Sequence, residues 1–75
     1  MTFLQFLRNS NSEAFRNLDL AQFIRQIAAD CGRPKSISNF YAYYRGTAPL
    51  PMKHRLMLGI KYQIPRSIII NPDIS

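Results

Sequence analysis

The stretch that decides the fold is Ser36-Ile37-Ser38-Asn39-Phe40-Tyr41-Ala42-Tyr43-Tyr44-Arg45-Gly46. Ile37, Phe40 and Tyr44 recur in it at helical spacing, so they are expected to face a core. Ser36 can cap the first amides of a helix, and Gly46 suits the position just past a helix end. The pattern therefore predicts a short helix between Ser36 and Gly46.

The other face of this helix carries short polar groups, a methyl group, a phenol and a guanidinium, from Ser38, Asn39, Tyr41, Ala42 and Arg45. Side chains of these kinds contact base edges in a major groove. Asn39 is the best single candidate, because its amide can pair bidentately with adenine. An ordinary surface helix is the alternative. We expect Tyr43 to pack in the core, whereas Tyr41 could either pack or stack on bases.

Length and charge limit the functions that are open to this chain. Seventy-five residues, of which 47% are apolar, make one domain over residues 1–75 with a modest core and no large enzymatic cleft. Three Arg balance three acids in the first 30 residues, so the formal charge of +6 lies in the second half. There, seven basic side chains are opposed only by Asp73: Arg33, Lys35, Arg45, Lys53, Arg55, Lys61 and Arg66. This imbalance favours nucleic acid as a partner over a merely solvated face.

The sequence carries no visible apparatus for catalysis. Its four carboxylates are not paired for acid–base work, and His54, the only His, has no other ligand at metal-site spacing. We expect no enzyme activity, metal, cofactor or small-molecule ligand. Cys31 is alone, which suits packing in a reducing cytosol. Met1 to Leu7 is too short to span a membrane and lacks a basic leader, so we expect a soluble, cytoplasmic, nucleoid-associated protein.

Helical patterns also precede the central stretch. Thr2 can cap a first short helix whose apolar side holds Phe3, Phe6 and Leu7. Residues 9–12 should break this helix, and Glu13 to Leu18 can add one more turn. The clearest periodicity follows Asp19 as N-cap and unites Leu20, Phe23, Ile24, Ile27, Ala28 and Cys31. Gly32 and Pro34 end this helix, and the short connector to the next one gives the skeleton of a helix-turn-helix.

The C-terminal third predicts one more helix and an ambiguous tail. Pro51 suits a first helical position, and the helix should run to about Lys61. Its inward side is expected to hold Met52, Leu56, Met57 and Ile60, and its solvent side Lys53, His54, Arg55 and Lys61. The β-branched run at residues 67–70 fits a short strand slightly better than a last helical turn. The expected fold class is an all-α helix-turn-helix domain of four or five helices, which ends in either a short C-terminal strand or a last helical turn.

Two short segments carry a resemblance to a known family. Ile27-Ala28 followed by Cys31-Gly32 resembles the first helix and turn of the Cro and lambda-repressor-like helix-turn-helix family. Gly46 to Pro51, with His54 and the apolar Leu56 and Leu58, is similar to the segment after the recognition helix in YdaS-like small regulators. The pattern covers roughly residues 24–60, and the interval from Gly32 to Gly46 is about two residues longer than in that family. The resemblance implies a Cro-like repressor of the kind found in phages and mobile elements.

These observations predict a sequence-specific DNA-binding regulator that acts by occupancy. The helix after Ser36 would enter the major groove of double-stranded DNA, and phosphates would be held by Arg33, Lys35, Ser36, Lys53, His54 and Arg55. A homodimer is expected, because one recognition helix reads few base pairs, and the candidate interface is the exposed edge of Ile68, Ile69 and Ile70. The alternatives are that these Ile close the core, and that the protein is a basic interaction module or inhibitor that binds an acidic protein.

Overall fold

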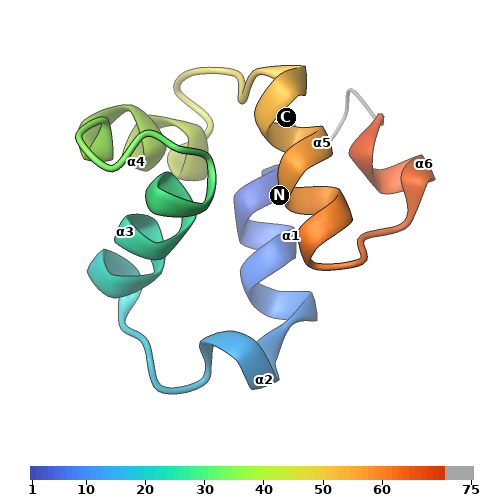
Figure 1. Ribbon diagram of the computed structural model, residues 1–75, viewed down its shortest axis with the longest axis horizontal. Helices are drawn as coiled ribbons and strands as arrows, with labels where there is room; N and C mark the ends of the chain where they lie inside the picture. Colours follow the sequence, from blue (N-terminus) through green and yellow to red (C-terminus); the bar gives the residue numbers. More distant parts are fainter. Residues whose placement is uncertain (71–75) are drawn as a thin grey trace.

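The computed structural model describes residues 1–70 and shows an all-α domain in that range. Its helices are α1 (Phe3–Ser10), α2 (Ser12–Phe15), α3 (Leu20–Asp30), α4 (Ile37–Arg45), α5 (Met52–Lys61) and α6 (Arg66–Ile69). Figure 1 shows α1 in the middle, with α3 and α4 on one side and α5 and α6 on the other. The all-α prediction is confirmed, and the described residues form six helices where four or five were expected.

The first and third helices begin as their sequences predict. Thr2 Oγ1 accepts a hydrogen bond from the Gln5 amide at 3.2 Å, and Gln5 Oε1 accepts one from the Thr2 amide at 3.1 Å. Asp19 and Gln22 make the same reciprocal pair at the start of α3, at 2.8 and 3.0 Å. Such capping boxes satisfy amides that have no partner inside the helix. Both predicted N-caps are confirmed.

Side chains at the start of α1 form hydrogen bonds with the end of α4. The carbonyl of Tyr44 accepts hydrogen bonds from Thr2 Oγ1 at 2.9 Å and from Gln5 Nε2 at 2.8 Å. Arg8 Nη1 donates to the Tyr44 hydroxyl at 3.0 Å. Carbonyls in the last turn of a helix lack partners within it, so these bonds stabilise the C-terminus of α4. The orientation of α4 is therefore fixed by α1.

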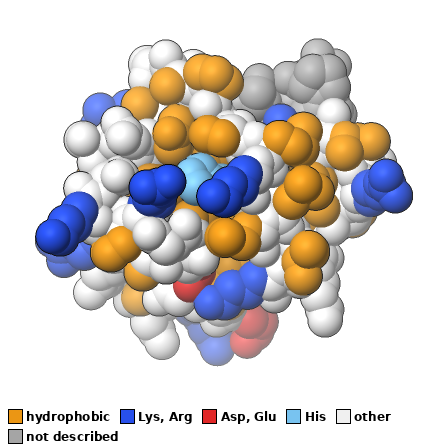
Figure 2. Space-filling view, turned by 45° about the horizontal axis from the view of Figure 1, so that its top comes forward, with side chains coloured by type: hydrophobic (Ala, Val, Ile, Leu, Met, Phe, Trp, Pro, Cys, Tyr) orange, Lys and Arg blue, Asp and Glu red, His pale blue; other side chains and the backbone are white. Residues whose placement is uncertain are grey.

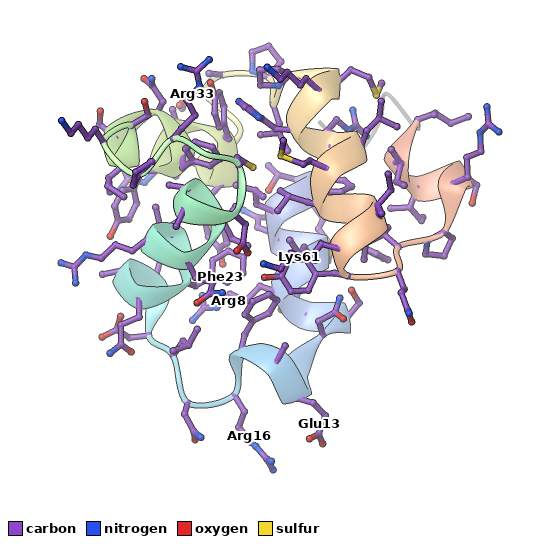
Figure 3. All side chains as sticks on the ribbon, in the orientation of Figure 1. Arg8, Glu13, Arg16, Phe23, Arg33 and Lys61 are labelled. Atoms are coloured by element: carbon purple, nitrogen blue, oxygen red, sulfur yellow. The ribbon has the colours of Figure 1, made fainter. Side chains whose placement is uncertain are left out.

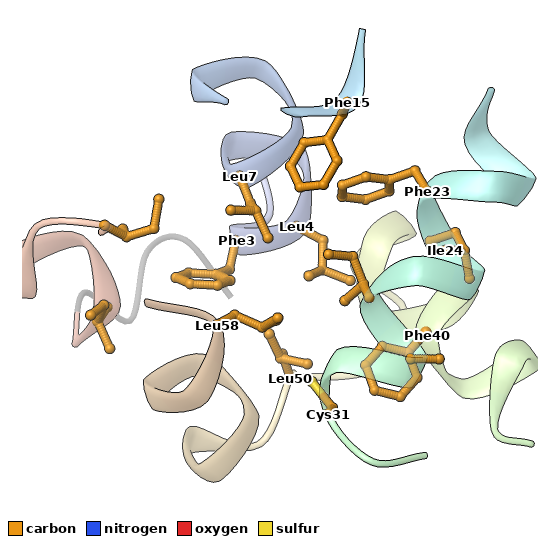
Figure 4. Packing of buried hydrophobic residues seen from close by; sticks show 14 residues of the cluster. Phe3, Leu4, Leu7, Phe15, Phe23, Ile24, Cys31, Phe40, Leu50 and Leu58 are labelled. Atoms are coloured by element: carbon orange, nitrogen blue, oxygen red, sulfur yellow. The ribbon is translucent and has the colours of Figure 1, made fainter. Parts of the chain in front are cut away.

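The core draws buried aromatic side chains from α1 to α4 and aliphatic ones from α5 and α6. Phe15 and Phe23 pack edge to face with ring centroids 4.8 Å apart (Figure 4). Phe40 is fully buried from α4, as predicted, and Figure 4 shows it near Cys31 and Leu50. One expectation for α1 is corrected: Leu4 is fully buried, whereas Phe6 is only partly buried.

The connector between α3 and α4 is short and is closed by backbone hydrogen bonds. Gly32 has φ +71°, a left-handed conformation that glycine adopts without strain. The Arg33 amide then reaches back to the Ala28 carbonyl at 2.8 Å, and the Gly32 amide to Ala29 at 3.0 Å. This is the Schellman pattern of a helix end. Gly46, with φ +85°, ends α4, so both predicted glycine stops are confirmed.

The predicted inward face of α5 is wrong. Met52, Leu56, Met57 and Ile60 are exposed, and the buried residues are His54, Arg55, Leu58 and Gly59. Gly59 explains the orientation, because a β-carbon there would overlap Ile69 Cδ1 and lie 2.7 Å from Ile69 Cγ1. The close approach of α6 thus requires the glycine side of α5 to face inward. Pro51 occupies the N-cap position and not the first helical position.

The predicted strand at residues 67–70 is also wrong, because Arg66–Ile69 is helical. The amides of Ile68 and Ile69 donate to the Pro65 carbonyl at 3.0 and 3.2 Å, so the segment satisfies its own backbone. The preference of β-branched residues for strands is weak, and packing overrides it here. Ile69 is only 6% exposed and Ile68 is partly buried, whereas Ile70 is exposed. The three Ile therefore do not form a common pairing edge.

Candidate nucleic-acid interface

Helix α4 turns one side to the core and the other to solvent. Of the five predicted base-contacting residues, Ser38, Asn39 and Arg45 are exposed, whereas Tyr41 and Ala42 are partly buried. The guanidinium of Arg45 lies 5.5 Å from the centroid of the Tyr41 ring. This cation–π contact keeps the phenol and the guanidinium together on the outer face. The five residues share one helix, and three of them are fully accessible to a partner.

The tyrosines of α4 lie at the boundary of the core. Tyr43 packs its ring against Phe40, with centroids 5.1 Å apart, and Tyr44 packs against Phe23 at 6.0 Å. Tyr41, Tyr43 and Tyr44 are all partly buried against the core cluster. Each ring is therefore engaged by the domain itself, which leaves little room for a stack of bases on these side chains.

The helix N-termini differ in a way that the sequence did not reveal. Thr2 and Asp19 cap α1 and α3 in extended conformations, with ψ of 166° and 177°. Ser36 occupies the N-cap position of α4 with ψ 39° and makes no side-chain capping bond, and no side chain of residues 1–70 caps α5. The predicted capping bond of Ser36 is therefore absent. Uncapped helix amides carry a partial positive charge and suit phosphate oxygens.

An open hollow lies beside the start of α4. Its volume is about 260 Å³, and it is lined by Arg33, Ser36, Asn39, Phe40, Tyr43 and His54. Figure 3 shows Arg33 at the end of the molecule where α4 begins. The hollow brings together four of the predicted contact residues: Arg33 and Ser36 from the connector, Asn39 from α4 and His54 from α5. No carboxylate of residues 1–70 lines it.

Six residues were predicted to contact phosphates, and the structure separates them into two groups. Arg33, Lys35 and Lys53 are exposed, and Ser36 is partly exposed beside them. His54 and Arg55 were expected near solvent but are only 8% and 4% exposed. For these two, the prediction of a solvent-facing side chain is wrong.

Arg55 is directed into the protein. Its guanidinium lies 5.3 Å from the centroid of the Phe3 ring, and its Nη2 donates to the Ile68 carbonyl at 3.2 Å. Burial lowers the pKa of this guanidinium from its ordinary value. Because the charge is engaged between α1 and α6, Arg55 is withdrawn as a phosphate contact. The sequence alone does not show whether an Arg is buried against an aromatic ring or exposed to solvent.

His54 lies in the hollow against the ring of Phe40, with centroids 5.6 Å apart. Its Nδ1 is buried and has no hydrogen-bond partner among residues 1–70. Burial lowers the pKa of the imidazole, and the charges of Arg33 and Lys53 lower it further. Figure 2 shows the His between two basic side chains. Burial and the two neighbouring cations therefore favour the neutral form of the His54 imidazole at pH 7.

The acidic side chains lie away from this face or are neutralised. Glu13 projects from α2 at the end of the molecule opposite Arg33 (Figure 3). The carboxylate of Asp30 is 8% exposed, accepts a hydrogen bond from the Tyr62 hydroxyl, and pairs with Lys61 Nζ at 2.7 Å. Asp73, the acid expected in the second half, lies outside the described residues. We define the basic cluster as the exposed side chains of Arg33, Lys35 and Lys53. Arg33 lines the hollow, Lys53 acts on the imidazole of His54, and Lys35 follows Arg33 by two residues in the connector. None of the three pairs with an acid among residues 1–70.

A second surface feature adjoins this cluster. The outer side of α5 exposes an apolar stripe, which we define as Met52, Leu56, Met57 and Ile60, and Ile60 is 78% exposed. Figure 2 shows hydrophobic side chains gathered beside the His and its basic neighbours. Isolated apolar residues on a surface are common, but four on one ten-residue helix are unusual. Sequence reasoning missed this stripe because it assigned these residues to the core.

Comparisons with known proteins add no family to this description. No family model matches the sequence, and neither the curated proteins nor the solved structures give a match. Within residues 1–70, no helix is both long and apolar enough to cross a membrane. The same residues contain no group of three or more His, Cys, Asp and Glu side chains placed to hold a metal ion.

Proposed function

We propose that this protein is a small sequence-specific regulator that binds double-stranded DNA by inserting α4 into the major groove. The observation that supports this most is that α4 exposes Asn39 and Arg45 along one helix and that the hollow at its uncapped start is lined by the exposed Arg33. Asn and Arg read base edges, whereas basic side chains and helix amides hold phosphates. The protein acts by occupying its site, as the resemblance to Cro-like repressors implies.

The roles divide by position on the surface. Ser38, Asn39 and Arg45 read bases, with Tyr41 and Ala42 supporting them from the partly buried edge of the same face. Arg33, Lys35, Ser36 and Lys53 hold phosphates on either side of the groove. A 75-residue basic domain suits this work in the cytoplasm, next to the nucleoid.

We expect Asn39→Ala and Arg45→Ala each to weaken binding to the preferred site by about 1–3 kcal/mol and to relax its sequence preference. Lys53→Ala is the matched control, because loss of a phosphate contact should weaken all sequences about equally. The measurement is selection of bound duplexes from a random pool, followed by titration of the selected and scrambled sequences. A selected motif that is unchanged in Asn39→Ala would show that α4 is not the reading helix.

A homodimer remains part of the proposal, but its interface moves from Ile68–Ile70 to the apolar stripe of α5. A single recognition helix covers too few base pairs for useful selectivity, so a second copy is needed on the duplex. An apolar stripe is self-complementary across a two-fold axis, as a symmetric dimer requires. The four side chains expose roughly a few hundred Å² together, which suits a weak dimer completed on DNA.

Ile60→Glu is expected to raise the dimer dissociation constant by about tenfold or more, because it places a charge at the most exposed point of the stripe. Asn17→Glu, with the same charge change in the loop before α3, should leave assembly unchanged. Sedimentation and the stoichiometry on a two-half-site duplex measure the effect. A wild type that stays monomeric at high concentration and binds DNA singly would rule out the dimer.

The second candidate function is an interaction module that binds an acidic protein through the same basic and apolar surface. The apolar stripe beside the basic cluster favours it, because protein partners commonly use an apolar centre with a charged rim. The two functions differ in how binding depends on salt, which is the measurement that separates them.

A further inference from the structure

The hollow beside α4 holds a histidine whose surroundings disfavour its charged form. Arg33 from the connector and Lys53 from α5 act on His54 as like charges, and the phenol of Tyr43 is the remaining titratable group on the lining from α4. The ring of Phe40 covers one side. His54 is 92% buried in this setting, and its Nδ1 lacks a partner among residues 1–70. The site is basic and polar, yet its central side chain is uncharged.

We infer that this hollow seats one backbone phosphate of the bound duplex and that His54 takes up a proton as the phosphate enters. The inference rests on the proposed function. The proton comes from solvent and stays on the imidazole, so each protomer binds up to one proton with the DNA and releases it on dissociation. The ligand is a phosphate oxyanion, whose charge opposes those of Arg33, Lys53 and the imidazolium.

The size and lining of the hollow fit this ligand. Its volume of about 260 Å³ is below the range of about 300–1,000 Å³ that is usual for small-molecule pockets, and it suits a phosphate group with a few waters. Ser36 supplies a hydroxyl at the start of α4, where no side chain occupies the free amides. The Ser36 hydroxyl and the Arg33 guanidinium thus line the same hollow beside the uncapped start of α4, a combination that suits an anion.

The net electrostatic effect of the surroundings on protonation of His54 changes from unfavourable to favourable when a phosphate enters the hollow. In the free protein, two cations and burial oppose protonation of His54. An anion in the hollow cancels the repulsion of Arg33 and Lys53 and adds attraction for the imidazolium, so the pKa of His54 rises in the complex. Affinity for DNA therefore increases as pH falls through the pKa of the complex. The increase stops below the pKa of the free protein, which lies under the ordinary value of 6.5.

The test is the affinity for one duplex at constant ionic strength between pH 5.5 and 7.5, together with NMR titration of the His54 ring. His54 is the only His in the sequence, so its ring signals are assigned without ambiguity. We expect the affinity of the wild type to rise on the order of tenfold toward pH 5.5, as uptake of up to one proton per protomer allows. The ring pKa should rise when duplex is added.

Two variants and one small anion sharpen this test. His54→Gln should bind with a flat pH profile, and Arg33→Gln, at an exposed position, should bind more weakly and take up less proton because its free His54 is less repelled. Inorganic phosphate alone is the probe for the hollow. If it raises the ring pKa as the duplex does, the site accepts any phosphate oxyanion. If only the duplex does so, the site requires the DNA backbone. Both results support the inference.

Three outcomes would overturn it. Duplex binding with an unchanged ring pKa and a wild-type pH profile identical to that of His54→Gln removes the proton uptake but leaves the DNA-binding function intact. Duplex binding with full proton uptake in Arg33→Gln would place the phosphate elsewhere. An absence of duplex binding at every pH, even with a ring pKa that responds to inorganic phosphate, would reject the DNA-binding function itself.

Discussion

Ile69→Lys is expected to destabilise the domain by more than about 4 kcal/mol and to leave it largely unfolded at 37 °C. Ile69 is 6% exposed and packs its Cδ1 and Cγ1 against Gly59, where even one extra carbon would not fit. Lysine there loses the apolar contacts of a buried Ile and brings a charge into the space between α5 and α6. A single core in a domain of this size rarely supplies more than about 3–5 kcal/mol, so such a loss removes most of the stability. Circular dichroism during thermal and urea unfolding measures the loss.

Ile70→Lys is the matched control, because the neighbouring side chain is 53% exposed and its replacement should change stability by no more than about 0.5 kcal/mol. The pair of variants also separates the two interpretations of the isoleucine run. An interface of all three Ile would lose assembly in both variants while both stay folded. A folded Ile69→Lys of wild-type stability would contradict the packing of α6 on α5.

The orientation of α5 shows where hydrophobic pattern fails as a guide. The apolar residues Met52, Leu56 and Ile60 are spaced four apart, so periodicity alone assigns them to the core. Packing is decided instead by shape, because a residue larger than glycine at position 59 would collide with Ile69 of α6. The aromatic ring of His54 and the long side chain of Arg55 then fill the inward side, since both carry substantial non-polar surface. A glycine inside a predicted helix was the available indication of close packing.

The sequence was sufficient to predict the helix ends that depend only on neighbouring residues. The caps Thr2 and Asp19 and the stops Gly32 and Gly46 depend on a few adjacent residues, and all four act as predicted. Ser36 fails as a capping side chain, although it is the right residue type, because its backbone is held at ψ 39° by the tight connector. Side-chain caps favour an extended N-cap residue, as Thr2 and Asp19 have. A cap is therefore predictable only when the chain before it is free to extend.

The sequence predicted which types of residue form the candidate site, but not which of their side chains are buried. The exposed positions Asn39 and Arg45 follow from the periodicity of one amphipathic helix. The hollow at His54 brings residues from the connector, α4 and α5 together, so it depends on how helices separated in sequence are packed. Its basic character was visible in the charge balance, whereas the burial of His54 required the three-dimensional structure.

We expect affinity for random duplex DNA to fall about 10³-fold between 50 and 200 mM salt for a pair of protomers, because each basic side chain that neutralises a phosphate releases condensed counterions. The three members of the basic cluster, Arg33, Lys35 and Lys53, give a slope of roughly −2.7 per protomer in log affinity against log salt.

The controls for this titration come from opposite ends of the molecule. Lys53→Ala should make the slope shallower by about 0.9. Arg16→Ala, at the exposed residue that follows α2 and lies at the end of the molecule opposite Arg33 in Figure 3, should leave it unchanged. An acidic globular protein carries no comparable layer of condensed counterions, so its complex would show a much weaker dependence. A flat titration with duplex, or equal slopes for Lys53→Ala and the wild type, would exclude the basic cluster as a phosphate-binding surface and leave the acidic protein partner as the better account of this charge.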